Sequence, residues 1–311
     1  MILHTGEALI DFIPVVDSRG NPAYRPAPGG SPYNSAIASS RLGVASAFLG
    51  RVSRDFFGDQ LLENLAKNEV DTSLVPRSDQ PSTLAFVKKT ETGEARYAFF
   101  VTDAADRALT RGDLPSPVPE NVECILFGSI SLIADPAGET ILSLVEQQLD
   151  GPVTSFDPNV RTVLIEDERA YLNRVERACR AASIIKISDE DLAWFRPQSS
   201  EEAAAEELLS SGSTRLVVVT RGAEGAFART EQASARVPAV PVEVSDTVGA
   251  GDAFHSAVLV WLSKHRKLSR GGLETLDTAE LDAMLGFAVG VAAKTCTRAG
   301  ADPPREGEVE M

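Results

Sequence analysis

The sequence predicts an α/β fold: a doubly wound, mostly parallel sheet flanked by helices, with a small β-sheet lid. Two observations predict this class. From about Val122 onward, continuous apolar runs of strand length alternate with helical patterns, as in parallel sheets covered on both faces. Before that point, apolar segments flank turn-rich tips, the pattern of β-hairpins. We therefore treat residues 1–311 as a single domain with a lid.

The lid is predicted from two hairpins in the N-terminal third, near residues 11–28 and near residues 84–101. In the second hairpin, Tyr97 and Phe99 alternate with Arg96 and Ala98, so one face of the lid is expected to be aromatic. Such a face could exclude water from a site, form the lid's own core or contact a second subunit.

The body of the chain is predicted from strands and helices that follow one another in turn. A helix is expected after Pro136, a second near residues 167–181 and a last one from Leu281 to Thr295. The strands are expected at residues 124–127, 153–156, 184–187 and 216–219.

The charge of the chain argues against nucleic acid and anionic membranes as partners. Thirty basic and 45 acidic residues give a formal net charge of −15, which repels phosphate backbones and anionic lipid. Any phosphate site must therefore be built locally, from backbone N–H groups, a metal ion and a few cations.

The three cysteines and the N-terminal residues favour a cytoplasmic protein. Cys124, Cys179 and Cys296 are far apart and lack metal-ligand spacing, so buried free thiols are expected. Met1–Thr5 has the pattern of a strand rather than of a signal peptide, and no window contains 18 uncharged apolar residues.

The segment with the strongest chemical signal is residues 246–254, Asp-Thr-Val-Gly-Ala-Gly-Asp-Ala-Phe. Its Gly249-Ala250-Gly251 turn opens an apolar helix, and the N–H groups of a first helical turn favour an anion. Asp252 lies in that turn, where it could accept the proton of a hydroxyl that attacks a phosphoryl group. On physical grounds alone, an ordinary stabilising aspartate at a helix start is an equal alternative.

Other catalytic motifs do not account for this segment. The turn lacks the last glycine of the dinucleotide-binding pattern, and the chain has no Walker pattern for a P-loop. His255 lies close to Asp252, but no nucleophile elbow accompanies them, so we reject a Ser-His-Asp hydrolase.

At this point the sequence resembles a known family. Residues 246–254 resemble the C-terminal signature of the ribokinase-like (PfkB) carbohydrate kinases, and residues 29–34 with 41–43 resemble the N-terminal one. The resemblance runs from about Gly6 to Asp302 and implies a ribokinase-like fold and an ATP-dependent kinase. It also implies that Gly249, Ala250 and Gly251 form the anion hole and that Asp252 is the catalytic base.

Several residues are expected to bind the sugar, because a polyol needs acceptors and donors in fixed geometry. The alternative for Asn34 is an ordinary residue at a helix start, and that for Arg161 is a surface ion pair. The expected set is Asp11, Gly29, Gly30, Asn34, Phe99 and Arg161.

On the nucleotide side, Ser188 and Asp191 replace the two residues of the family's Asn-x-x-Glu segment. Asp191 is therefore expected to reach Mg²⁺ through water, with a plain acidic helix start as the alternative. The resemblance also implies a possible K⁺ site at Asp246 and Val248. The expected nucleotide-binding residues are Lys186, Ser188, Thr220, Gly222, Gly225, Gly249 and Gly251.

For the sugar, residues 6–14, 127–132 and 157–161 are most similar to bacterial fructokinases. The resemblance implies transfer of phosphate from ATP to O6 of D-fructose. A kinase of 2-keto-3-deoxygluconate or ribose is the alternative, followed by a non-catalytic sugar sensor. The expected partners are a sugar, ATP and a second copy bound through the lid.

Overall fold

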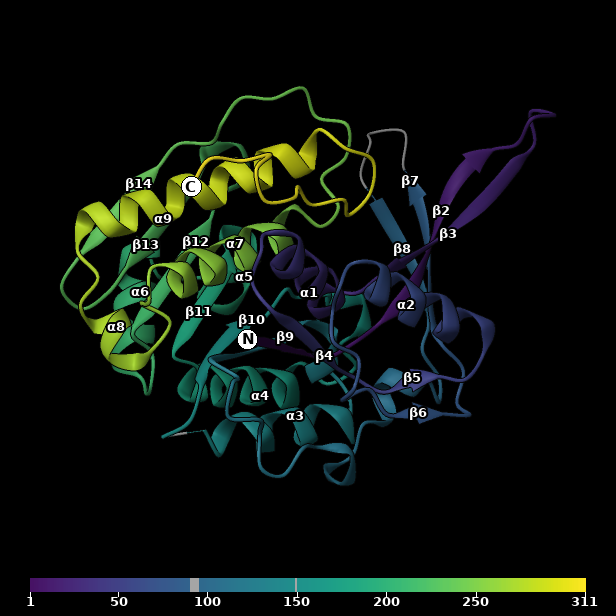
Figure 1. Cartoon of the computed structure of the whole chain (residues 1–311), viewed down its shortest axis with the longest axis horizontal. Helices are drawn as coiled ribbons and strands as arrows, with labels where there is room; N and C mark the ends of the chain where they lie inside the picture. Colours follow the sequence, from purple (N-terminus) through teal and green to yellow (C-terminus); the bar gives the residue numbers. More distant parts are fainter. Residues whose placement is uncertain (90–94, 149) are drawn as a thin grey trace.

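In the computed structural model, the described chain comprises residues 1–89, 95–148 and 150–311, with residues 88–89 and 95–97 described by their backbone only. Within this part an eight-stranded sheet forms the centre of the molecule (Figure 1). Its order is β14 (Ser234–Val237), β13 (Ala226–Arg229), β12 (Leu216–Thr220), β11 (Ile184–Ser188), β10 (Val153–Asp157), β9 (Cys124–Gly128), β1 (Ile2–Thr5) and β4 (Ser46–Leu49).

The strands from β12 to β4 in this order are parallel, and among the described strands of this sheet only β13 runs in the opposite direction, antiparallel to both β12 and β14. β1 lies between β9 and β4, with Ile2 opposite both Cys124 and Ser46. Because the carboxyl ends of the parallel strands meet at one edge, the loops that follow them gather there. The mostly parallel α/β fold predicted from the sequence is confirmed.

Helices cover both faces of this sheet (Figure 1). Neighbouring strand residues belong to different cores: Ile2 packs with the cluster on α7 and α9, and Leu3 with the cluster on α3 and α4. Since both faces are buried, the strands are continuously apolar, which is why they were predictable. One face carries α1 (Ser31–Arg41), α7 (Ala250–Lys264) and α9 (Thr278–Cys296), and the other α3 (Ala137–Glu146), α4 (Glu168–Ala181) and α6 (Glu201–Ser210).

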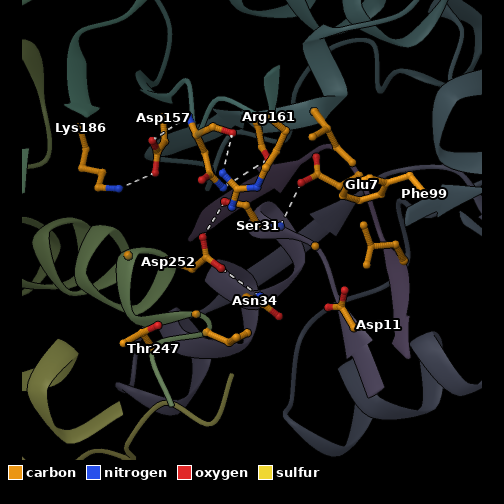
Figure 2. A pocket seen from close by; sticks show the side chains of 18 residues that line it. Glu7, Asp11, Ser31, Asn34, Phe99, Asp157, Arg161, Lys186, Thr247 and Asp252 are labelled. Atoms are coloured by element: carbon orange, nitrogen blue, oxygen red, sulfur yellow. Dashed lines mark hydrogen bonds and ion pairs between the residues drawn. The ribbon is translucent and has the colours of Figure 1, made fainter. Parts of the chain in front are cut away.

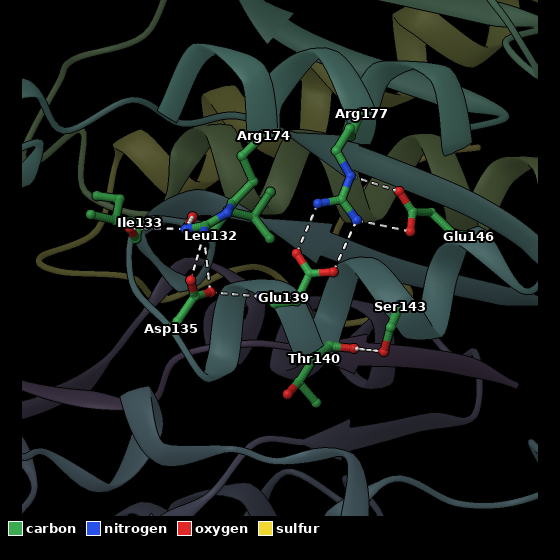
Figure 3. Close-up of polar contacts among 9 residues, drawn as sticks. All are labelled: Leu132, Ile133, Asp135, Glu139, Thr140, Ser143, Glu146, Arg174 and Arg177. Carbon is green, nitrogen blue, oxygen red and sulfur yellow. Dashed lines mark hydrogen bonds and ion pairs between the residues drawn. The ribbon is translucent and has the colours of Figure 1, made fainter. Parts of the chain in front are cut away.

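Two arginines of α4 bond to α3 and to the turn that follows β9 (Figure 3). Arg177 donates to the carboxylates of Glu139 and Glu146 on α3, at 2.8–3.1 Å. Arg174 donates to the carbonyl oxygens of Leu132 and Ile133 at 2.8 and 3.1 Å. The turn after β9 is therefore fixed from outside the sheet.

A smaller sheet projects from the body (Figure 1). Its order is β3 (Pro22–Gly29), β2 (Leu9–Val16), β7 (Thr83–Lys89) and β8 (Ala95–Phe100). The β2–β3 and β7–β8 pairs are antiparallel, and β2 pairs with β7 in parallel, with Leu9 opposite Thr83. Its base packs through Ile10 on Tyr33 of α1 and on Leu61 of α2 (Phe56–Lys67).

The two faces of the small sheet differ in their side chains. Asp11, Ala85 and Phe99 are directly opposite one another across three strands and so share a face. The other face carries Phe12 stacked on Phe86, with ring centroids 4.5 Å apart. Phe99 lies on the face with Asp11 and lines the cavity described below, while the side chain of Tyr97 lies outside the described residues, so the expected aromatic face stays a prediction there. The face of Phe12 and Phe86, which was not singled out from the sequence, also carries aromatic rings.

The remaining described elements are short and connect the layers. No helix in the described residues is long and apolar enough to cross a membrane. These elements are β5 (Val52–Ser53), β6 (Arg77–Ser78), α5 (Asp189–Phe195) and α8 (Arg270–Glu274), with 3-10 turns η1 (Ala105–Ala108), η2 (Arg111–Asp113), η3 (Ser129–Leu132), η4 (Thr162–Leu164) and η5 (Gly222–Glu224).

Candidate active site

A cavity of about 290 Å³ lies where the small sheet meets the carboxyl ends of the parallel strands (Figure 2). Glu7 reaches it from the loop after β1, Ser129 from the turn after β9, and Asp157 and Lys186 from β10 and β11. Open α/β sheets bind ligands at this edge because the strand ends and helix starts meet there.

The first turn of α7 forms one wall of the cavity. Gly249, the N-cap, has a φ of 76°, and a Cβ there would lie 2.6 Å from the Cβ of Ala301, so only glycine fits. Gly249 and Gly251 line the cavity, as predicted for an anion hole. Ala250 is not among the lining residues, and its N–H donates to the carbonyl of Thr247 at 3.2 Å.

Asp252 lies in this turn with both carboxylate oxygens held by α1 (Figure 2). The Ser31 hydroxyl donates to Oδ1 at 2.6 Å, and the Asn34 amide donates to Oδ2 at 2.9 Å. Burial raises the pKa of Asp252 to about 6, although both hydrogen bonds act to lower it. A carboxylate with this pKa is suited to accept a proton near neutral pH.

Lys186 supplies a cation beside the glycine turn. A Cβ on Gly251 would lie 3.4 Å from its Nζ, which places the ammonium next to the candidate anion hole. Its Nζ also donates to Asp157 Oδ2 at 2.8 Å, and both side chains are buried. Burial is the largest influence on the pKa of Lys186 and acts to lower it, but the charge and hydrogen bond of Asp157, with the charges of Asp191 and Asp252, together raise it, so the lysine stays charged.

Asp157 also belongs to a buried arrangement that resembles a Ser-His-Asp triad. The Ser155 hydroxyl lies 2.6 Å from His255 Nε2, and His255 Nδ1 lies 4.0 Å from Asp157 Oδ2. Ser155 is fully buried, so no substrate reaches it. Burial lowers the pKa of His255 to about 4, so the imidazole is neutral, and the rejection of a hydrolase agrees with this geometry.

The small sheet brings Asp11 and Phe99 to the opposite end of the cavity from Lys186 (Figure 2). Burial raises the pKa of Asp11 to about 6, and the nearby charge of Arg161 acts to lower it. Gly29 does not line the cavity. A Cβ there would lie 2.4 Å from Asp11 Oδ2, so its role is to leave room for that carboxylate.

Arg161 and Gly30 also line the cavity, and their contact with a sugar stays a prediction. The Arg161 guanidinium donates to the carbonyl of Val160 at 3.0 Å, which turns it back onto its own loop. Asn34 also lines the cavity, but its amide nitrogen is bonded to Asp252. The structure thus brings most predicted sugar-side residues together around one cavity.

Sequence reasoning missed Glu7, which is buried, lines the cavity and accepts a hydrogen bond from the Ser31 N–H at 3.0 Å. Burial raises the pKa of its carboxyl group. A signal was available, because Glu7 follows the first strand directly, at the strand end where ligands bind. Other lining residues that were missed are Leu9, Ser31, Ser129, Ile130, Asp157, Asn159 and Thr247.

Several predicted nucleotide residues lie outside this cavity. Ser188 is the N-cap of α5 and accepts from the Asp191 N–H at 3.0 Å, while Asp191 Oδ1 accepts from the Val160 N–H at 3.3 Å. Thr220 ends β12. Because Gly222 and Gly225 also lie outside the lining, contacts of this group with a nucleotide stay predictions.

Asp246 joins two loops next to the glycine turn. Its Oδ1 accepts from the Val248 N–H at 3.2 Å and its Oδ2 from the Gly300 N–H at 3.1 Å. Val248 lines the cavity, whereas Asp246 does not. The loop after α9 is thereby fixed against the start of α7.

Comparison with known proteins finds similarity to carbohydrate kinases in both family and individual sequences. The model of the pfkB family carbohydrate kinases matches residues 1–306. A fructokinase from Rhizobium leguminosarum bv. trifolii is 41% identical over 281 residues, which cover 90% of this chain and 85% of that protein.

Solved structures agree with this match. Fructokinase from Xylella fastidiosa with bound ATP has a TM-score of 0.89 and 29% identity, covering 96% of this chain and 93% of its own. Fructokinase from Vibrio cholerae O395 with fructose, ADP and calcium ion has a TM-score of 0.84 and 30% identity, covering 96% and 94%. A double mutant of the latter was solved with fructose, ADP and potassium ion, at the same TM-score.

The capping bond of Ser188 leads to a stability prediction. Replacing Ser188 by alanine removes the acceptor for the Asp191 N–H and should lower the free energy of unfolding by about 1 kcal/mol. Ser188→Asp keeps a capping oxygen and should restore most of this loss. Urea denaturation of the three proteins measures both effects, and an equal loss in both variants would show that Ser188 does not act as a cap.

Proposed function

The chain belongs to the pfkB family of carbohydrate kinases and is an ATP-dependent sugar kinase, and we propose that it is a fructokinase. It would transfer the γ-phosphoryl group of ATP to O6 of D-fructose, giving fructose 6-phosphate and ADP. The observation that carries this proposal is the position of Asp252, between the cation of Lys186 and the sugar-side carboxylate of Asp11 in one cavity.

Fructose is proposed as the acceptor because the similar proteins described above, over nearly the whole chain, are named fructokinases. The cavity suits a polyol. Asp11 offers an acceptor and Arg161 offers donors, while Phe99 offers an apolar surface from the small sheet. 2-Keto-3-deoxygluconate and ribose are tested as alternative acceptors below, and the sensor alternative predicts no turnover.

Asp252 is proposed as the general base. Its carboxylate would take the proton of the O6 hydroxyl as O6 forms a bond to the γ-phosphorus, while the bond from that phosphorus to the β,γ-bridging oxygen breaks and ADP leaves. The bonds from Ser31 and Asn34 fix both carboxylate oxygens, so the base is oriented before the sugar binds.

The charge of the transferring group would be met by Lys186 and the start of α7. The Lys186 ammonium lies next to Gly251, and the positive end of the α7 dipole points to the same place. In a protein with a net charge of −15, this local arrangement offsets the unfavourable field.

Mg²⁺ is proposed as the metal of the reaction, where it would neutralise charge on the nucleotide phosphates. Among the described residues, no group of three or more acidic, histidine or cysteine side chains forms a metal site. This fits an ion held mainly by phosphates and water. Asp191, whose Oδ1 accepts from the Val160 N–H in the loop after β10, would reach this ion through water.

A monovalent cation is proposed for the loop pair that Asp246 joins. Carbonyl groups near Val248 and Gly300 would hold K⁺, as oxygen-rich loops do for hard cations. Support comes from the potassium ion in the Vibrio cholerae fructokinase mutant.

The small sheet is proposed to close over the sugar and to contact a second copy of the chain. Asp11 and Phe99 face the cavity, so closure would exclude water, a competing phosphoryl acceptor. On the opposite face, Tyr24 and Phe100 are 48% and 62% exposed and each contacts the half-buried Phe86 ring edge-on, which supports a homodimer. A cytoplasmic location is also proposed, because the three cysteines are free.

The first prediction concerns sugar and base together. With ATP and Mg²⁺, the native chain should release ADP fastest with fructose in a panel that includes ribose, glucose and 2-keto-3-deoxygluconate. Asp252→Asn should lower kcat by about 10² to 10⁴-fold, because the amide cannot accept the proton. Turnover on another sugar would overturn fructose, and turnover on none would favour the sensor.

The second prediction concerns pH. Because Asp252 must be ionised to act and its pKa is raised to about 6, kcat/KM should fall as the pH drops through about 6. Asp11 has a similar pKa, so the profile is repeated with Asp11→Asn, which should have weaker fructose binding but keep the acidic limb. If the acidic limb of kcat/KM vanishes in Asp11→Asn, the titrating group is Asp11 and not Asp252.

The third prediction concerns assembly. Sedimentation velocity should show a dimer for the native chain and a monomer for Phe100→Glu, because the new charge would be buried at the contact. The matched control is Val240→Glu, at an apolar residue 48% exposed outside the small sheet, which should stay dimeric. A native monomer, or a dimer in both variants, would contradict the proposed contact.

A further inference from the structure

We propose that Glu7 is a positioning residue for Asp252, acting through the first turn of α1. This role rests on the proposed function, in which Asp252 is the base, and it deepens that function by naming what holds the base in place. Glu7 belongs to the loop after β1 and Asp252 to α7, and Ser31 at the start of α1 is bonded to both.

The Glu7 carboxylate joins two parts of the chain that are far apart in sequence. Oε1 accepts from the Ser31 N–H at 3.0 Å, and Oε2 accepts from the Ser131 hydroxyl. The Glu7 N–H also donates to the Ser131 hydroxyl oxygen at 2.8 Å. Oε2 and the main-chain N–H of Glu7 are therefore fixed by the turn after β9, which Arg174 secures from α4 (Figure 3).

Glu7 takes the place of a local cap on α1. The N-cap of this helix is Gly30, which has no side chain to accept from the first N–H groups. Gly30 has a φ of 113°, and a Cβ there would lie 2.7 Å from the Glu7 carbonyl oxygen. Glycine thus lets Glu7 pack against the helix start, and a remote carboxylate does what the N-cap cannot.

The first turn of α1 carries both hydrogen-bond donors of Asp252. Ser31, whose N–H is bonded to Glu7, donates its hydroxyl to Asp252 Oδ1 at 2.6 Å, and Asn34, three residues later, donates its amide to Oδ2. Without the Glu7 carboxylate, the Ser31 N–H would lose its partner and the turn would be free to fray. The base would then lose part of the alignment that phosphoryl transfer requires.

The position of Glu7 in the cavity allows one competing role, direct contact with the sugar. The two roles differ in what they change. A sugar contact would mainly affect the KM for fructose. A positioning role would affect kcat and the pKa of Asp252, since the hydrogen bonds from Ser31 and Asn34 act to lower that pKa.

The test compares Glu7→Ala with Glu7→Gln, which keeps an oxygen acceptor for the Ser31 N–H. Glu7→Ala should lower kcat by about 10- to 100-fold with little change in the KM for fructose, and should move the acidic limb of kcat/KM to higher pH. Glu7→Gln should recover most of both effects. The loss caused by Glu7→Ala should be smaller in a Ser31→Ala background, because the two residues act in one chain of contacts.

Two further variants separate positioning from stability. Asp277→Ala removes a comparable cap from α9, far along the chain, and should leave kcat and the pH profile unchanged. If Glu7→Ala does not fold, Glu7→Asp, whose side chain is shorter, should move the acidic limb of kcat/KM in the same direction by a smaller amount.

Hydrogen exchange tests, without measuring catalysis, whether Glu7 holds the first turn of α1. The amides of Ser31 and of residues 33–35 should exchange faster in Glu7→Ala than in the native chain or in Asp277→Ala. An increased KM for fructose in Glu7→Gln with an unmoved acidic limb, or native kcat in Glu7→Ala, would overturn the positioning role. A native chain without turnover would instead refute the proposed function. Unchanged hydrogen exchange in Glu7→Ala would then, independently, refute the claim that Glu7 holds the start of α1.

Discussion

The site depends on one interaction, the pair of hydrogen bonds that helix α1 donates to the carboxylate of Asp252. Two helices that start at the same edge of the sheet meet there, α7 with the carboxylate and α1 with the Ser31 hydroxyl and the Asn34 amide. The helices continue as packed neighbours on one face of the sheet, so the contact is fixed by the core beneath it. A base with a fixed direction needs little reorganisation when a hydroxyl approaches.

The second constraint is electrostatic. A chain with a net charge of −15 offers a nucleotide no general attraction, and the cavity itself contains several carboxylates. The structure compensates with a buried Lys186, kept charged by Asp157 and placed beside the glycine turn of α7. The same burial raises the pKa of Asp252 and of Asp11 to about 6, which leaves both ionised at neutral pH.

Much of this could be read from the sequence, and the exceptions have physical reasons. The parallel strands were predictable because both of their faces are buried, and Asp252 because it follows a glycine turn at a helix start. Glu7 was missed although it lies just after the first strand, where ligands bind. Ser31 was missed because its role comes from a contact with Asp252, far away in sequence, which no local pattern reveals. The stacking of Phe12 on Phe86 was not foreseen, because it depends on the pairing of β2 with β7, two strands far apart in sequence.

The central claim is that this cavity places a sugar hydroxyl between Asp252 and the terminal phosphate of ATP. The most direct test is a crystal structure of the chain with D-fructose and a non-hydrolysable ATP analogue. We expect O6 to lie within hydrogen-bond distance of the Asp252 carboxylate and to face a terminal phosphate bound at Gly249–Gly251 beside Lys186. A fructose with O6 turned away from Asp252, or a terminal phosphate bound away from that turn, would contradict the account.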